Sequence, residues 1–129
     1  MKKLLLLLLI AASCSGGDVP LTPEEQAAEQ ARLCYDSLYH GHATYFLSHR
    51  LNVDSMPQSY QQQLIEAYDY YVQRMERRHQ GVCGVTVSHT QRDNEQAMVQ
   101  VFLQLAFADS TTERIVVPMV ERDGQWMMK

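Results

Sequence analysis

Apolar residues follow the period of an α-helix through the first half of the chain. In the first such segment the apolar positions are Ala27, Ala31, Cys34 and Leu38. Thr22-Pro23-Glu24-Glu25 supplies a capping threonine, a proline suited to the first helical turn and a glutamate that completes a capping box. The pattern therefore predicts a helix from about Thr22 to Gly41, where the glycine breaks it, and a short second helix over residues 43–50.

The longest helical pattern lies further along the chain. Its apolar and aromatic positions are Tyr60, Leu64, Tyr68, Tyr71, Val72 and Met75. Ser55 and Gln58 have the spacing of a second capping box, and Gly81 is expected to end the helix. The arginines of the last turns complement the helix dipole, which favours a solvated helix end over an anion site.

After Gly81 the apolar period changes from 3.6 to 2, which is typical of β-strands. Strands are expected at residues 83–88, 97–108, 114–121 and 125–129, joined by short turns. The Asp123-Gly124 pair is typical of a two-residue hairpin turn. Pro118 has no N–H group for the ladder, so a bulge or an unpaired stretch is expected beside it.

The order of these elements predicts one α+β domain, in which three N-terminal helices pack on a curved four-stranded antiparallel sheet. A chain of 129 residues has room for a single domain of this kind. The second and third strands carry apolar residues on both faces. We therefore expect the helices to cover one face of the sheet, and the other face to curl or to pack on a partner.

The N-terminus has the pattern of a secretory signal. Lys2 and Lys3 precede an apolar run at residues 4–12, and small residues lead to Cys14. A helix of nine residues spans roughly 13 Å, whereas a bilayer core needs about 30 Å, so the run does not cross a membrane. Removal of residues 1–13 takes two lysines from a chain of net charge −4 and leaves −6. Because lysine and arginine form no cluster, the composition argues against a nucleic-acid partner.

Residues Ala11-Ala12-Ser13-Cys14 resemble the lipobox of bacterial lipoproteins, although Ala11 stands where leucine is commonest. The resemblance implies that Cys14 becomes the first mature residue and carries acyl chains such as palmitate. Residues 14–21 would then form the lipidated cysteine and a tether, of which the last seven residues reach at most roughly 25 Å. It also implies a membrane of the bacterial cell envelope, with the outer membrane favoured. The alternative is an ordinary secretory signal with a cysteine at this position by chance.

Several short segments in the rest of the chain carry a family resemblance. They are residues 38–42, 46–47, 59–61, 101–103, 117–120 and 123–126. With the order of elements, they resemble the nuclear-transport-factor-2-like, or cystatin-like, superfamily, and more narrowly its small envelope lipoproteins of unknown function. The resemblance covers residues 22–129 and implies a cone that holds an apolar pocket and an open sheet face that often dimerises. Members include isomerases, dehydratases, polyketide cyclases and domains without chemistry, so the fold does not fix function.

An isomerase or dehydratase in such a pocket would need an acid or base with a shifted pKa and a donor for the developing oxyanion. The candidate donors are Tyr39, Tyr68 and Tyr71, and the candidate bases are Asp36, Asp69 and His89. His89 is the most interesting base, because it continues the predicted strand face of Val85 and Val87. Tyrosines at helical spacing, however, are more often core residues whose hydroxyls reach the rim. We therefore favour a domain that is not an enzyme and needs no cofactor.

Histidine and cysteine positions add little chemistry. His40, His42 and His49 lie close together, but their spacing matches no zinc motif, so no metal site is predicted. Cys34 and Cys83 are both expected on core faces. In the envelope they could form a disulfide, which would contribute about 3–4 kcal/mol, and two buried free thiols are an equally good interpretation.

The sequence as a whole predicts a lipid-anchored envelope protein with a non-catalytic module that binds a ligand or another protein. The expected partners are the membrane, reached through the anchor, a second copy or another envelope protein, and a small apolar ligand. Two alternatives stand beside this prediction. One is a small-molecule isomerase or dehydratase that uses the cone pocket, and the other is a structural subunit that associates through its exposed sheet.

Overall fold

The computed structural model describes residues 19–129, so the predicted signal peptide and Cys14 lie outside the described part. Its elements are α2 (Pro23–Tyr39), α3 (Ala43–Ser48), a 3₁₀ turn (Val53–Ser55), α4 (Gln58–His79), β1 (Val82–Asp93), β2 (Met98–Phe107), β3 (Thr112–Arg122) and β4 (Gln125–Met128). The four strands form one antiparallel sheet in the order β1-β2-β3-β4. The predicted fold class, three helices on a four-stranded antiparallel sheet, is confirmed.

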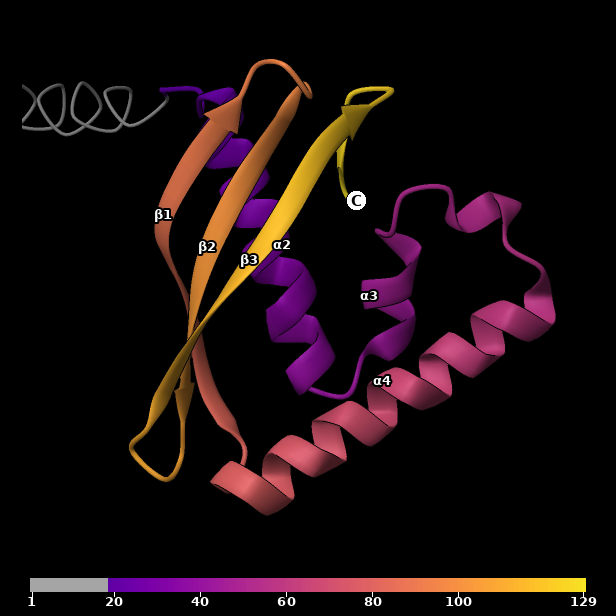
Figure 1. Ribbon diagram of the computed structural model, residues 1–129, viewed down its shortest axis with the longest axis vertical. Coiled ribbons are helices and arrows are strands. Elements are labelled where there is room, and N and C mark those ends of the chain that lie inside the picture. The colour runs from indigo at the N-terminus through magenta and orange to yellow at the C-terminus, as the bar shows by residue number, and fades with distance from the viewer. Residues whose placement is uncertain (1–18) are drawn as a thin grey trace, which may run out of the picture.

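Helix α2 packs along one face of the sheet, as Figure 1 shows. The side that it turns to the sheet carries small residues, including Ala27, Ala31 and Cys34, each with no exposed surface. Alternate residues of β2 complete the core: Val99, Val101, Leu103, Leu105 and Phe107. Small side chains on the helix let its backbone approach the larger side chains of the strand closely, so the centre of the core is solid.

Helix α4 is less buried than its length suggests. Figure 1 shows it crossing beyond one end of the sheet, with α3 between its N-terminal half and the strands. Met75 is the buried residue of α4. The other apolar side chains of its inner side are only half-buried: Leu64, Ile65, Tyr68, Tyr71 and Val72. This side of α4 therefore borders space that the described residues leave open.

The ends of the helices and the last hairpin show which local predictions hold. Thr22 and Glu25 form the predicted capping box, with reciprocal backbone-to-side-chain bonds of 3.1 and 2.9 Å. Asp123 and Gly124 both have positive φ, as the predicted two-residue turn requires. The prediction of a second capping box at Ser55 and Gln58 is wrong, because the residue before α4 is Pro57 and no side chain caps this end of the helix.

Two bulges in β1 overturn predictions about its faces. The register runs from Val82 opposite Phe107 to Gly84 opposite Ala106, so Cys83 is an extra residue. A second extra residue, Ser88, moves His89 to the face of Phe102, opposite to the core. Cys83 and His89 are both exposed, so the prediction that they lie on the core face is wrong for each. The cause is that each extra residue reverses the alternation of side chains beyond it.

The expected bulge at Pro118 is absent from the described β2–β3 ladder, where Pro118 lies opposite Gln100 in an unbroken register, but the expected unpaired stretch is present on the other side of β3, because its pairing with β4 begins at Met119. Its carbonyl accepts a 2.9 Å hydrogen bond from the backbone N–H of Lys129. The N and O atoms of one residue in an antiparallel strand point to the same side. The proline nitrogen therefore faces the side of β4, which ends at Met128 and does not pair with Pro118. The missing N–H group of Pro118 thus costs the β2–β3 ladder no hydrogen bond.

Among the described residues, no helix combines the length and the apolar character needed to cross a membrane.

The core assignment predicts a large difference between two leucines. Leu103 has no exposed surface, whereas Leu33 on the outer side of α2 is 37% exposed. Leu103→Ala should lower the free energy of unfolding by about 3–5 kcal/mol, and Leu33→Ala by less than about 1 kcal/mol. Urea unfolding of the two variants, followed by circular dichroism, measures this difference. Equal losses would place the core elsewhere.

Candidate functional site

An aromatic hollow of about 260 Å³ lies where α2, α3, α4 and β3 meet. Its lining residues are Tyr35, Leu38, Phe46, Arg50, Tyr68, Tyr71 and Ile115, and we call this site the aromatic hollow. Edge-to-face contacts fix its rings, with Tyr35 and Phe46 centred 5.0 Å apart and Phe46 and Tyr68 4.9 Å apart. Because three helices each supply part of this ring cluster, the walls are set by tertiary packing.

Arg50 is placed by the backbone that follows α3. This segment makes a parallel bridge to Met128 of β4. The N–H of Leu51 donates to the Met128 carbonyl at 2.7 Å, and the Met128 N–H donates to the His49 carbonyl at 2.8 Å. The chain at Arg50 is therefore held beside β4 by one isolated bridge, and the Arg50 side chain lines the aromatic hollow.

The guanidinium of Arg50 is only partly satisfied. Its Nη1 donates a 3.2 Å hydrogen bond to the hydroxyl of Tyr68. Its Nε is buried and has no hydrogen-bond partner in the described part of the chain. A buried donor without a partner costs about 1–3 kcal/mol, so such groups in native proteins call for an explanation.

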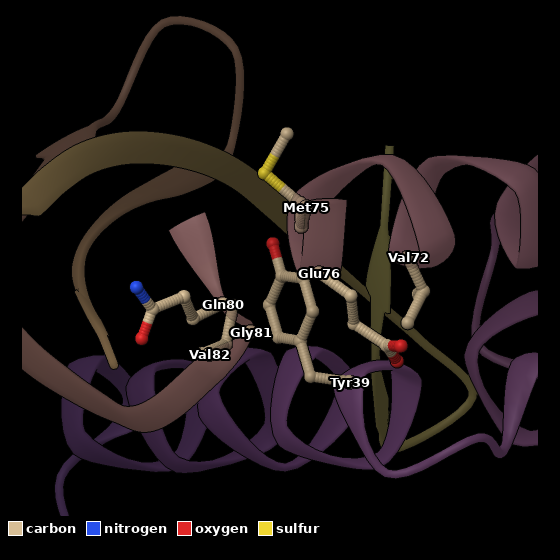
Figure 2. Close-up of a pocket in the computed structure, with 7 residues that line it drawn as sticks. All are labelled: Tyr39, Val72, Met75, Glu76, Gln80, Gly81 and Val82. Carbon is tan, nitrogen blue, oxygen red and sulfur yellow. The ribbon is translucent and has the colours of Figure 1, made fainter. Parts of the chain in front are cut away.

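A second hollow of about 400 Å³ lies at the C-terminal end of α4. Figure 2 shows Tyr39 rising from α2 between Glu76 and Gln80, two polar residues of its lining. The Tyr39 hydroxyl is 2.7 Å from that of Tyr71, which lines the aromatic hollow. This hydrogen-bonded pair of tyrosines connects the linings of the two hollows.

Burial keeps the hydroxyls of Tyr35 and Tyr39 protonated by raising the pKa of each. It raises the pKa of Tyr35 to about 12, with a further contribution from Tyr71. Burial also raises the pKa of Tyr39, as does its hydrogen bond with Tyr71. At neutral pH both side chains are therefore neutral hydroxyls, able to donate a hydrogen bond but not to act as bases.

The structure brings the candidate donors together but not the candidate bases. Tyr68 and Tyr71 line the aromatic hollow, and Tyr39 joins them through its hydroxyl. Asp36 lies on α2 with its carboxylate 3.6 Å from the imidazole of His40.

Asp69 is exposed on α4, and the ring of His89 lies 5.5 Å from Phe102 on the outer face of the sheet. None of the three candidate bases, Asp36, Asp69 or His89, lines either hollow.

The three neighbouring histidines lie on the surface around α3. His40 and His42 flank Gly41 and are exposed, and the Nδ1 atom of His49 lies 2.9 Å from the Tyr45 carbonyl. Within residues 19–129, no group of three or more histidine, cysteine or acidic side chains is placed to hold a metal ion.

Cys34 and Cys83 are both free thiols in the structure, so the predicted alternative of a disulfide is not formed. Cys34 is buried against the sheet, and burial raises its pKa to about 11. Cys83 is exposed at its bulge, and its thiol donates a 3.3 Å hydrogen bond to the Ala106 carbonyl. The expectation of two buried thiols is therefore correct for Cys34 and wrong for Cys83.

Arg50 is the residue that sequence reasoning missed. The helix prediction over residues 43–50 ended on it and assigned it no role. A signal was present, because Arg50 is a lone cation between the apolar Phe46-Leu47 pair and Leu51. A single charged residue beside apolar neighbours is either exposed to solvent or held against other side chains in the fold. Which of the two applies to Arg50 depends on its bridge to Met128 of β4, which the local sequence does not reveal.

The fold matches a solved structure. A protein from Campylobacter jejuni, described as a candidate NTF2-like transpeptidase, superposes with a TM-score of 0.63 over 78% of this chain and 94% of that chain. This domain has an NTF2-like fold. The sequence identity is 12%, so the likeness of the NTF2-like domain to that protein concerns the fold alone. No family model and no curated protein matches the sequence.

The two cysteines of the NTF2-like domain should differ in reactivity. At pH 8 without reductant, N-ethylmaleimide should label the exposed Cys83 in the native protein and should label Cys34 only after unfolding. Cys34 is buried, and its pKa of about 11 keeps it in the unreactive thiol form at this pH. Peptide mass spectrometry measures both sites, and Cys83→Ser should remove the native label. Failure to label either cysteine in denaturant would establish a disulfide instead.

The raised pKa of Tyr35 should make stability depend on alkaline pH. The folded pKa of about 12 exceeds the reference value of 10.0, so the unfolded state releases its proton first. The stability held below pH 10 is lost as pH rises through about 12, by up to about 3 kcal/mol. Tyr35→Phe should flatten this decline in urea unfolding between pH 9 and 12. The exposed Tyr60→Phe is the control, and an equal slope in both variants would contradict the burial of Tyr35.

Proposed function

We propose that the protein is a lipid-anchored protein of the bacterial cell envelope whose NTF2-like domain binds a ligand in the aromatic hollow and does no chemistry. The observation that carries the binding role is this hollow, where fixed rings lie beside a half-buried arginine, the one cation of the lining. Concave sites with apolar walls and a few convergent polar groups are typical of small-molecule binding.

The anchor rests on the sequence. Two lysines, a short apolar run and small residues lead to Cys14, in the order of a lipoprotein signal. Two or more acyl chains hold a protein to a membrane far more firmly than one chain does. With a tether of about seven residues before α2, the domain would work within roughly 25 Å of the membrane surface.

Binding without chemistry is favoured by the lining of the aromatic hollow. General acid–base catalysis requires a titratable group within hydrogen-bond reach of the substrate, with a pKa close to the working pH. The lining of the hollow offers one arginine and three tyrosines as its polar side chains. Because Tyr35 is protonated far above neutral pH, and Arg50 is always charged, neither serves as a general base.

The transpeptidase description of the Campylobacter protein is not carried over to this chain. Acyl transfer through the enzyme requires an activated nucleophile beside a base. The Cys34 thiol is buried with a pKa of about 11, and the Cys83 thiol is bonded to a backbone carbonyl instead of an imidazole. In the described part of the chain, neither thiol is hydrogen-bonded to a histidine, lysine or arginine side chain, the neighbours that generate a reactive thiolate.

Replacement of Cys14 tests the anchor. In a bacterial host, the wild-type chain should be found in the membrane fraction and should partition into detergent, with acyl groups on a mature N-terminus at Cys14. Cys14→Ser should be found in the aqueous phase or as an uncut precursor, because serine offers no sulfur to the acyl chain. Cys83→Ser is the matched control and should behave as wild type.

Mass spectrometry of the intact mature protein completes this experiment. A wild-type N-terminus upstream of Cys14, or a Cys14→Ser product that has lost residues 1–13 and still partitions into detergent like wild type, would contradict the anchor. Neither result would affect the proposal that the aromatic hollow binds a ligand, because the hollow is formed by residues 35–115.

A further inference from the structure

The charge of Arg50 has no counter-ion within 4 Å among residues 19–129. The four ion pairs among the described residues involve other arginines and histidines, and none includes Arg50. The lining of the aromatic hollow contains no carboxylate. Arg50 is half-buried beside aromatic rings and so loses part of its hydration, and an anion that entered the hollow would be favoured by its charge.

The terminal nitrogens form the edge of the guanidinium that an anion could reach. Nε is enclosed by the surrounding side chains with essentially no surface open to water, so a carboxylate oxygen cannot bind it there. Nη1 donates to the Tyr68 hydroxyl and keeps a second N–H, and Nη2 forms no hydrogen bond among the described residues. The terminal edge presents one N–H group from Nη1 and one from Nη2 in parallel, which match the two oxygens of a carboxylate.

We propose that the aromatic hollow recognises a small carboxylic acid with an apolar or aromatic body, the carboxylate binding the Nη1–Nη2 edge of Arg50 and the body lying among the rings. This inference rests on the proposed function, since it names the ligand class of the same site. Arg50 is the one cation in the lining of the hollow and matches a ligand with one negative charge. A carboxylate is therefore favoured over a phosphate group, which is usually held by several donors or cations.

The walls of the hollow fit the rest of such a ligand. Phe46 of α3 and Ile115 of β3 offer apolar surface to a ligand. Tyr35 of α2 adds an aromatic face and a hydroxyl that stays protonated at neutral pH. A volume of about 260 Å³ is small for a ligand site, which favours a single ring or a short branched chain as the body.

Matched acids and alcohols test the inference. The full chain is purified in a nonionic detergent and titrated with 3-(4-fluorophenyl)propionate and with the corresponding alcohol, each followed by fluorine NMR against empty micelles. The acid should bind saturably, and the alcohol at least about tenfold more weakly, because it cannot accept both N–H groups with a charge. Arg50→Met should reduce the affinity for the acid to that for the alcohol.

Two further variants control for net charge and folding. Arg78→Met removes the same charge from an exposed position on α4 and should bind the acid like wild type. Arg50→Lys keeps the charge but has no bidentate edge, so its affinity should lie between those of wild type and Arg50→Met. If Arg50→Met fails to fold, as judged by circular dichroism, Arg50→Lys and the acid–alcohol comparison still decide the question.

The results separate this inference from the proposed function. Equal binding of acid and alcohol, with tyrosine ring signals of the hollow perturbed by both and with Arg50→Lys unchanged, would overturn carboxylate recognition and leave the hollow as a binding site. Absence of saturable binding by this acid and by 4-methylpentanoate would overturn the carboxylate inference. If the matching alcohols also left the tyrosine signals unperturbed, the proposal that the hollow binds a ligand would be contradicted as well.

Discussion

Two backbone hydrogen bonds between the segment after α3 and the last strand hold the aromatic hollow in place. The bonds on either side of Arg50, at 2.7 and 2.8 Å, attach this segment to Met128. This attachment places Arg50 beside β4, the last strand of the sheet, while α3 brings Phe46 against Tyr35 of α2 and Tyr68 of α4. Without this bridge, the guanidinium would have no fixed position relative to the rings.

The packing of the helices is uneven in a way that matches this arrangement. Helix α2 buries its small residues fully, and these contacts with β2 supply the hydrophobic stabilisation of the domain. Helix α4 leaves most of its apolar side half-buried, although filling the hollow with larger side chains would bury it. Apolar surface left open beside a cavity reduces stability, and proteins retain such sites mainly where a partner or ligand covers them.

The sequence was sufficient for the elements and insufficient for the site. The helical period of α2 and α4, the Thr22 cap and the Asp123-Gly124 turn are local signals, and each predicted its element correctly. The faces of β1 could not be read in this way, because an extra residue at Cys83 or Ser88 leaves no mark in the residue pattern. The tyrosines were identified as candidates, but their assembly around Arg50 depends on a contact between segments far apart in the chain.

The unused donor of Arg50 bears on what the domain was selected for. If stability alone shaped this position, an apolar residue of similar volume would pack among the same rings without the loss of hydration that a buried cation suffers. Arg50 is only half-buried, but its Nε atom is enclosed by the surrounding side chains and has no partner in the described part of the chain, a cost that a solvated arginine would avoid. A guanidinium held at this position can recognise an anion that enters the hollow from outside. The hydrogen bond from Nη1 to Tyr68 supports this, because it orients the group, and Nη2 forms no hydrogen bond among the described residues.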